Sequence, residues 1–348
     1  MSALRVATVA SAIAVSAAVG VACAETPAEF YKGKTITLWI GFAPGGEDDL
    51  WARTIARHFG NHIPGDPVVV PQNVPGSGGL LVADRLYNTA PQDGTVIGLI
   101  NRGIPFEPLL GGQGTKFDPL KFNWIGSPGR DTTVCAARKD APVKTLQDLY
   151  SKELTVGGTG SGADTAIYPQ FLAALLGMKF RIVLGYQGSH EVQLAMERNE
   201  VQGICLAYDS LERSTLARAQ EIKILLQASL EPDPRIRGVP SGLDLAQAPE
   251  QRQALQLFFA RASIGRPMVA PPAVPADRIA ALRQAFDETL RDAEFLDDAR
   301  RQDLNVVPLS GRQIADVIAG AYNSPPAVVK RTMQAMGRDM GRDMGRDK

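Results

Sequence analysis

The sequence predicts an α/β protein that is divided into two lobes. Strand-like runs of β-branched and aromatic residues alternate with helix-like segments along most of the chain, at the spacing of strand–helix–strand units. This alternation is typical of α/β folds with mainly parallel sheets. The chain has 348 residues, which is more than one hydrophobic core usually organises, so two lobes are expected.

The N-terminus predicts export to the periplasm. Arg5 precedes an uncharged run from Val6 to Cys23, which ends in the small-x-small triplet Ala22-Cys23-Ala24. This pattern indicates a secretory signal peptide over residues 1–24. Two alternatives remain: the run could be a membrane anchor, or Cys23 could become a lipid-modified first residue.

The first third of the exported chain has two strand–loop–helix units and a third strand. We expect strands at 35–42, 68–70 and 95–100, with helices after the glycine-rich loops at 43–46 and 75–79. The middle repeats the pattern. We expect strands there at 133–137, 154–156, 179–184, 203–207 and 222–226, and helices at 145–150, 164–176 and 191–198.

The last third is expected to be mainly helical. A loop rich in Pro and Gly at 231–242 marks a return between lobes. Apolar residues at helical spacing predict helices at 251–259, 277–290, 293–301 and 311–322. The repeated Met-Gly-Arg-Asp segment at the end has no apolar face, so residues 337–348 are predicted to form a disordered tail.

Composition and sparse motifs exclude several classes of function. The 37 Lys+Arg residues balance the 37 Asp+Glu residues, which gives no support for nucleic-acid binding. His58 and His62 stand four residues apart, but no zincin glutamate accompanies them, so we expect no metal site. We also expect no cofactor and a monomeric protein.

Cys135 and Cys205 would be the only cysteines left after removal of the signal peptide. Both lie in strand-like runs, and in an oxidising compartment they could form a disulfide. The alternative is a pair of buried free thiols that act as small hydrophobic residues.

A collinear set of short motifs resembles the substrate-binding receptors of tripartite tricarboxylate transporters, also called Bug-type receptors. Each motif is weak alone, but their order along nearly the whole exported chain is specific. The matching stretches are 41–46 with Asp49 and Ala52-Arg53, then 73–79, 90–95, 157–162, 185–188 and 269–275.

The resemblance implies a type II periplasmic binding fold, in which two α/β lobes close on a small organic acid. Residues 25–130 and 231–336 would form the first lobe, and residues 131–230 the second. The resemblance also implies delivery of the ligand to the membrane permease subunits of a tripartite tricarboxylate-type transporter. The ligand would be held by two loops that match residues 43–49 and 158–165 here.

Both loops follow a strand and begin a helix, so their backbone N–H groups and the helix dipole favour an anionic oxygen. The glycines allow close backbone approach, although they could instead serve tight turns. The hydroxyls could cap the second helix, Asp49 and Asp164 could cap helix ends, and Tyr208 could belong to the core. The candidate ligand-binding residues are Ala43, Pro44, Gly45, Gly46, Asp49, Thr159, Gly160, Ser161, Asp164, Thr165 and Tyr208.

Glu47 and Asp48 depart from the family pattern, because they extend the first loop into an acidic run. Either the ligand carries an amine beside its carboxylate, or these acidic side chains point to solvent. Arg102 and Arg130 follow predicted strands and could offset the acidic charge, although both also suit the surface. His190 begins a helix and could cap it or contact the ligand.

The rival hypothesis is an enzyme that uses residues 158–163 as a dinucleotide fingerprint. That motif needs an acidic residue about twenty positions later, and residues 181–186 contain none. A phosphate-loop lysine and a Gly-x-Ser-x-Gly motif are also missing. We therefore predict a binding protein without catalytic residues. Presentation of the loaded receptor to a membrane sensor, instead of a permease, remains an alternative.

Overall fold

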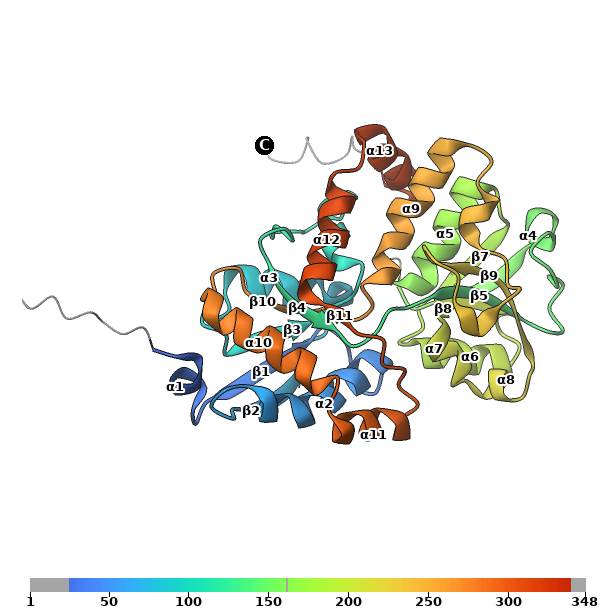
Figure 1. Ribbon diagram of the computed structural model, residues 1–348. Helices are drawn as coiled ribbons and strands as arrows, with labels where there is room; N and C mark the ends of the chain where they lie inside the picture. Colours follow the sequence, from blue (N-terminus) through green and yellow to red (C-terminus); the bar gives the residue numbers. More distant parts are fainter. Residues whose placement is uncertain (1–24, 161, 339–348) are drawn as a thin grey trace, which may run out of the picture.

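A computed structural model of the protein describes residues 25–160 and 162–338. These residues form two α/β lobes that lie side by side (Figure 1). The six strands of the first sheet have the order β11-β4-β10-β3-β1-β2, and the five strands of the second have the order β7-β6-β8-β5-β9. The predicted signal peptide lies outside the described residues. No helix in the described part of the chain is both long and apolar enough to cross a bilayer.

The first sheet combines a parallel half and an antiparallel half. Strand β1 (Thr35–Ile40) pairs in parallel with β2 (Val68–Asn73) and β3 (Val96–Leu99). Strand β10 (Met268–Ala270) pairs antiparallel with β3 and with β4 (Asn123–Ser127), and β11 (Leu309–Ser310) pairs antiparallel with β4. Alternate residues of β1 are fully buried, as a strand with one face on a core requires.

The second sheet is also mixed. Strand β6 (Leu154–Gly158) pairs in parallel with β7 (Phe180–Leu184) and β8 (Gly203–Ala207). Strand β5 (Thr133–Arg138) pairs antiparallel with β8 and with β9 (Ile222–Ala228). Cys135 lies directly opposite Cys205 in this pairing, with their Cα atoms 4.1 Å apart, and their sulfur atoms are bonded. Register alone therefore brings the two cysteines into bonding range.

Helices cover both sheets. The helices of the first lobe are α1 (Pro27–Tyr31), α2 (Glu47–Phe59), α3 (Leu80–Asn88), α10 (Ala276–Thr289), α11 (Ala293–Arg301) and α12 (Gly311–Tyr322). The remaining α-helices are α4 (Asp148–Ser151), α5 (Asp164–Leu176), α6 (Ser189–Glu197), α7 (Tyr208–Glu212), α8 (Thr215–Arg218), α9 (Pro249–Ser263) and α13 (Pro326–Ala335). Short 3₁₀ turns are η1 (Gly60–His62), η2 (Ser77–Gly79), η3 (Ile104–Phe106), η4 (Pro234–Ile236) and η5 (Gly242–Leu245).

The expectation of mainly parallel sheets is wrong, because strands β4, β10 and β11 add an antiparallel half to the first sheet. These strands were not predicted. Strands β10 and β11 have only three and two residues, too few to show a period of two. Their pairing is set by the path of the chain as it returns from the other lobe. The predicted helices α5, α11 and α12 agree with the structure at both ends.

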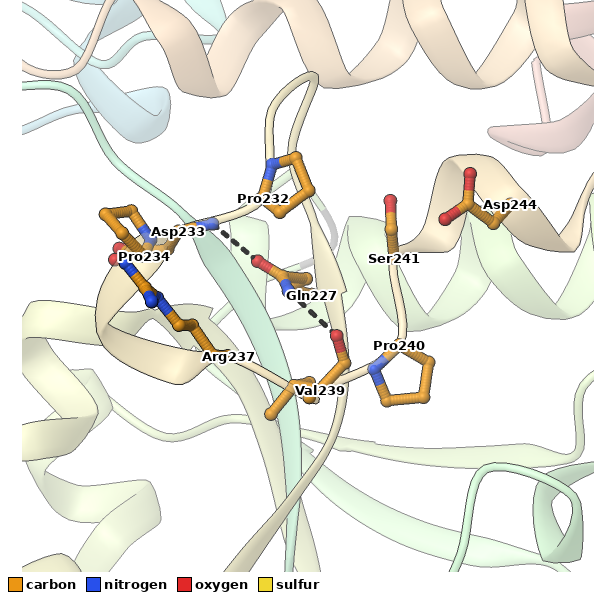
Figure 2. Close-up of a pocket in the computed structure, with 10 residues that line it drawn as sticks. Gln227, Pro232, Asp233, Pro234, Arg237, Val239, Pro240, Ser241 and Asp244 are labelled. Carbon is orange, nitrogen blue, oxygen red and sulfur yellow. Dashed lines mark hydrogen bonds between the residues drawn. The ribbon is translucent and has the colours of Figure 1, made fainter.

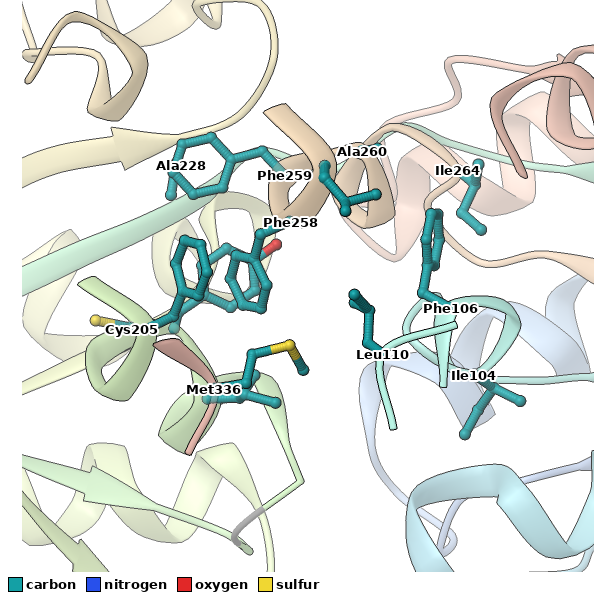
Figure 3. Packing of buried hydrophobic residues seen from close by; sticks show 14 of the residues in the cluster. Ile104, Phe106, Leu110, Cys205, Ala228, Phe258, Phe259, Ala260, Ile264 and Met336 are labelled. Carbon is teal, nitrogen blue, oxygen red and sulfur yellow. The ribbon is translucent and has the colours of Figure 1, made fainter. Parts of the chain in front are cut away.

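Helices α9 and α13 lie against α5, on the side of the second sheet, although they follow residue 231 in the sequence. Phe258 of α9 stacks on Phe171 of α5 with ring centroids 3.9 Å apart, and its ring meets that of Tyr168 at 4.8 Å. Figure 3 shows Phe258 facing Phe106 and Leu110 of the first lobe. One buried cluster thus contains residues of both lobes.

The chain crosses between the sheets at residues 128–132 and again at 264–267, and these two crossings touch. The Ser127 hydroxyl donates to the Gly129 carbonyl at 2.8 Å and accepts from the Arg266 N–H at 2.9 Å. Gly265 has a φ of +55°, and a Cβ at this position would lie 1.7 Å from the Gly129 carbonyl oxygen. Only glycine allows this contact.

The predicted disordered tail lies mostly outside the described residues. Gly337 and Arg338 are described, and the Arg338 guanidinium lies 2.9 Å from the Glu107 carboxylate and donates to the Leu110 carbonyl at 3.0 Å. These contacts attach the end of α13 to the first lobe.

Candidate ligand-binding cleft

A cleft of about 510 Å³ lies where the two lobes meet. Helices α2, α5 and α6 all begin at its wall, so their N-terminal N–H groups and positive dipole ends surround one space. The lining residues are Phe42 to Asp48, Asn101 and Arg102 from the first lobe, Thr159, Ala163 to Thr165, Gln187 to Glu191, Leu206, Ala207 and Ser210 from the second, and Asp131, Gly265 and Arg266 from the crossings.

Most of the first predicted loop lines the cleft. Ala43, Pro44, Gly45 and Gly46 form its wall at the start of α2. Gly45 has a φ of +87° and therefore needs glycine, whereas Gly46 has an ordinary φ and open space beside it. The loop thus brings the start of α2, with its positive dipole end, to the wall of the cleft.

Asp49 supports this loop and does not line the cleft. Its carboxylate accepts hydrogen bonds from the Gly45 N–H at 2.9 Å, from Asn73 Nδ2 at 2.7 Å and from Arg53 Nε at 3.0 Å. Burial alone would raise the pKa of Asp49, but the hydrogen bonds from Arg53, Gly45 and Asn73 hold it below its usual range. The charged carboxylate thus fixes the conformation of the loop around Gly45.

The second predicted loop contributes Thr159, Asp164 and Thr165 to the lining. The Thr165 hydroxyl accepts from the Thr159 N–H at 3.0 Å and lies 3.1 Å from the Thr159 hydroxyl, so it closes the loop. Gly160 is not among the lining residues, and a Cβ added there would meet no atom within 4 Å. Ser161 lies outside the described residues.

Asp164 pairs across the cleft. Its carboxylate lies 2.7 Å from Arg102 Nη2 and 3.6 Å from Arg261 Nη2. Arg102 follows strand β3 and also donates to Asp131 and, at 2.9 Å, to the Thr133 hydroxyl. One guanidinium therefore holds together the first lobe, the first crossing and the start of α5.

The alternative that both arginines lie on the surface is wrong for Arg102, which is only 5% exposed, and holds for Arg130, which is exposed. The carboxylates that hold Arg102 are distant in sequence. Only the two acidic partners make burial of this charge possible, and no local sequence pattern identifies them.

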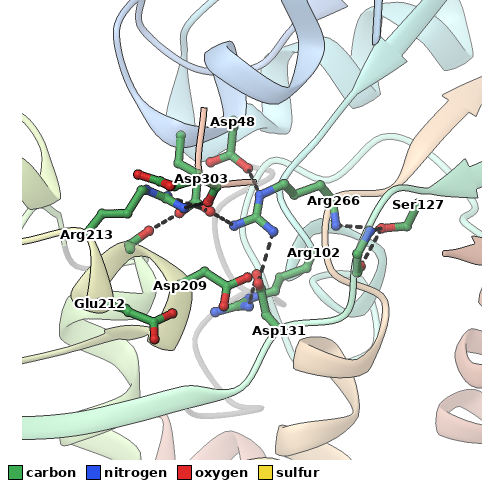
Figure 4. Close-up of polar contacts among 12 residues, drawn as sticks. Asp48, Arg102, Ser127, Asp131, Asp209, Glu212, Arg213, Arg266 and Asp303 are labelled. Carbon is green, nitrogen blue, oxygen red and sulfur yellow. Dashed lines mark hydrogen bonds and ion pairs between the residues drawn. The ribbon is translucent and has the colours of Figure 1, made fainter. Parts of the chain in front are cut away.

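Arginines at the wall of the cleft engage the acidic side chains of Glu47 and Asp48, so the alternative in which both point to solvent is wrong. Glu47 lies 2.7 Å from Arg266 and 2.9 Å from Arg213, and Asp48 lies 3.5 Å from Arg266. Arg266 pairs in turn with Asp131 at 2.9 Å. Figure 4 shows Asp48, Arg213, Arg266 and Asp131 gathered in this network.

The network shifts the pKa values of Asp48 and Asp131 in opposite directions. Burial raises the pKa of Asp48 to about 7, with the nearby Glu47 and Asp131 charges adding to the rise and Arg266 opposing it. Burial also acts to raise the pKa of Asp131, but Arg266 and Arg102 hold it below its usual range. Asp131 therefore stays charged at neutral pH, whereas Asp48 is close to its midpoint.

Tyr208 lies beside the cleft, outside its lining. Its hydroxyl donates to Glu212 at 3.2 Å, and the Arg235 guanidinium lies over its ring at 4.8 Å. The start of α6 takes part instead, through Gly188, Ser189 and His190. The glycine-rich stretch 185–188, followed by a predicted helix, was the sequence signal for this third helix start.

A second cavity, of about 470 Å³, lies in the loop that follows β9. Gln227 holds this loop by accepting from the Asp233 N–H and donating to the Val239 carbonyl, both at 2.8 Å (Figure 2). Prolines, together with Gln227 and its two hydrogen-bond partners, form much of the wall of this cavity. No α-helix begins among its lining residues, so it lacks the anion-binding geometry of the cleft.

Comparison with known proteins agrees with this geometry. Residues 51–333 match the model of the tripartite tricarboxylate transporter family receptor. A protein of Cupriavidus necator, named UPF0065 protein in gbd 5'region, is 24% identical over 327 residues, which cover 91% of this chain and 94% of the relative.

Solved structures share the fold at lower identity. A TctC solute-binding protein from Polaromonas, without ligand, is 19% identical with a TM-score of 0.64, covering 88% of this chain and 99% of its own. MatC from Rhodopseudomonas palustris, with bound malate, is 20% identical with a TM-score of 0.66, covering 87% and 99%. A further R. palustris protein, with adipate, is 18% identical with a TM-score of 0.66, covering 88% and 98%. The chain therefore belongs to the tripartite tricarboxylate transporter receptor family, a family of periplasmic solute-binding proteins.

Proposed function

We propose that this protein is a periplasmic receptor that captures a small organic acid and delivers it to the permease subunits of a tripartite tricarboxylate-type transporter. The observation that carries the proposal is the convergence of helices α2, α5 and α6 on one cleft between the lobes. Three positive helix ends at one cavity favour a carboxylate over a neutral or cationic group. The malate and adipate held by two structural neighbours support this class of ligand.

Ligand contacts are assigned to the backbone of residues 43–46 and, in the second loop, to Thr159 and Thr165, which line the cleft. Gly160 does not line the cleft, and Ser161, outside the described residues, stays a candidate from the sequence alone. Asp49 and Asp164 act by positioning these loops, because their carboxylates are already engaged by Arg53 and Arg102. Tyr208 is engaged by Glu212 and Arg235 and has no assigned contact with the ligand.

We expect export to be accompanied by removal of residues 1–24. Mass spectrometry of the protein from the periplasm should find Glu25 at the N-terminus. A chain that begins at Met1, or at a lipid-modified Cys23, would contradict this part of the proposal.

A thermal-shift screen of the purified protein tests the binding function. It should include mono-, di- and tricarboxylates and aromatic acids, with calorimetry on each hit. We expect at least one acid to raise the melting temperature and to be recovered chemically unchanged. If no acid binds, or if the purified protein converts the acid into a product, the proposed function is wrong.

A further inference from the structure

Glu47, the first residue of α2, has a carboxylate enclosed by groups from outside its own lobe. Its side chain is 11% exposed. Arg213 Nη2 lies 2.9 Å and Arg266 Nη2 lies 2.7 Å from Glu47 Oε1, and the Ser210 hydroxyl donates to Oε2. Two guanidinium groups at ion-pair distance and one hydroxyl surround this carboxylate, a set of groups that is typical of protein sites for bound acids.

Glu47 is one of the carboxylates that offset the arginines of this network. Four acidic groups contact four basic groups through close ion pairs: Glu47, Asp48, Asp131 and Asp164 on one side, and Arg102, Arg213, Arg261 and Arg266 on the other. Within the described residues, Arg213 pairs with no carboxylate except that of Glu47; its remaining contact is the Asp303 backbone carbonyl at 3.1 Å. Loss of the Glu47 charge would leave a positive excess at the wall of the cleft.

The Glu47 carboxylate also lies where a ligand group would be expected. Glu47, Ser210 and Arg266 all line the cleft, and α5 and α6 begin at the same cavity. An acid whose first carboxylate is bound at the starts of α5 and α6 would direct its other end toward α2. At that end, the basic groups are already occupied by a carboxylate of the protein itself.

We infer that Glu47 determines the specificity of the cleft: its carboxylate fills an anion site made by Arg213, Arg266 and Ser210, and excludes a second carboxylate of the ligand. The inference rests on the proposed function and refines it. The ligand class becomes organic acids with one carboxylate and an uncharged remainder, because a dicarboxylate would place its second charge against Glu47.

The first test asks whether removal of Glu47 opens an anion site. Acetate is titrated into ligand-free wild type, Glu47→Ala and the double variant Glu47→Ala/Arg213→Ala, with melting temperature as the readout. We expect acetate to raise the melting temperature of Glu47→Ala by several degrees more than it raises that of wild type or of the double variant. An equal response of Glu47→Ala and wild type would overturn the inference.

Two further variants control this test. Glu47→Ser keeps a good helix-start residue and replaces Glu47→Ala if that variant does not fold. Asp303→Asn removes only the exposed pair with Arg218, which also crosses between the lobes. It should respond to acetate as wild type does, and a response equal to that of Glu47→Ala would also overturn the inference.

The second test measures selectivity with butyrate and succinate, which have the same number of carbons but one and two carboxylates. The ratio of succinate affinity to butyrate affinity should rise by about tenfold or more in Glu47→Ala, as expected when a charge-assisted pair replaces a repulsion. An unchanged ratio would contradict the role in specificity. If wild type binds no acid while acetate still stabilises Glu47→Ala, the proposed function fails and the anion site stands. If wild type binds an acid while acetate has no effect on Glu47→Ala, the inference alone fails.

Discussion

Behind the cleft, aromatic rings hold α9 on α5 of the second lobe, and inside the cleft ion pairs join the two lobes; we call these the aromatic junction and the ionic junction. Phe258, Phe171 and Tyr168 are fully buried and contact one another through ring faces and edges. Arg102 and Arg266 are almost as buried, but their carboxylate partners line the cavity. The aromatic junction excludes water whatever the cleft contains, whereas the energy of the ionic junction depends on what the cleft contains. Permanent packing within the second lobe and the response of the two lobes to a ligand are thus assigned to different chemistry.

The largest expected effect comes from breaking the aromatic junction. Phe258→Ala should lower the free energy of unfolding by about 4 kcal/mol, because it removes a fully buried ring and leaves a cavity. Phe258→Leu is the control and should cost about 1.5 kcal/mol. Urea denaturation measures both. If ligand affinity of the folded Phe258→Ala protein falls sharply, the two junctions are not separate in function.

Breaking the ionic junction should cost somewhat less. Arg102→Met keeps most of the side-chain volume but leaves Asp131 and Asp164 without their shared partner, at a cost of about 3 kcal/mol in stability. The matched control is Arg130→Met, at an exposed position in the same region, with a change within about 0.5 kcal/mol. Equal effects of the two substitutions in urea denaturation would show that the buried network contributes nothing.

The disulfide is a covalent link within the second sheet, close to both junctions. Replacing Cys135 and Cys205 by serine should reduce stability by about 2–4 kcal/mol, since the bond closes a long loop in the unfolded chain. Peptide mapping without reductant should recover the linked pair from the native protein. Free alkylation of both thiols would reject the bond.

The pH dependence of stability should separate the ionic junction from the aromatic one. The pKa of Asp48 is raised by burial from 3.8 to about 7, so the folded protein binds its proton more tightly than the unfolded chain. Stability should therefore fall as pH rises from about 4 to about 7. The side chain is 30% exposed, which limits the loss to about 1–2 kcal/mol. Asp48→Asn should reduce the dependence of the melting temperature on pH between about 4 and about 7. If the melting temperature of this variant changes with pH as that of wild type does, Asp48 is not the cause.

The smallest effect is expected in the second loop. Thr165→Val removes the hydroxyl that accepts from the Thr159 N–H, and should cost about 1 kcal/mol in stability and about tenfold in ligand affinity. Thr215→Val, at the exposed start of α8, is the control. Calorimetry with an acid from the screen compares them, and equal affinity of both variants would remove Thr165 from the site.

The parts that were predicted from the sequence are those with a local signal. Helices α5, α11 and α12 have apolar periodicity or clear boundaries, and the glycine-rich loops before α2, α5 and α6 mark the ends of strands. The missed parts depend on contacts between distant residues. Strands β10 and β11 exist because their neighbours pair with them, and the partners of Arg102 and Arg266 come from segments far apart in the chain. Sequence spacing carries no information about such pairs.

The positions of α9 and α13 have a consequence for attempts to divide the molecule. A fragment of residues 131–230 contains all five strands of the second sheet but lacks both helices that cover α5. Phe171 and Tyr168 would then face water, and the excised piece would tend to associate through that surface. A usable fragment would need α9 and α13 grafted back onto it by new linkers. The second lobe is thus compact in space but is not encoded by one continuous segment of the gene.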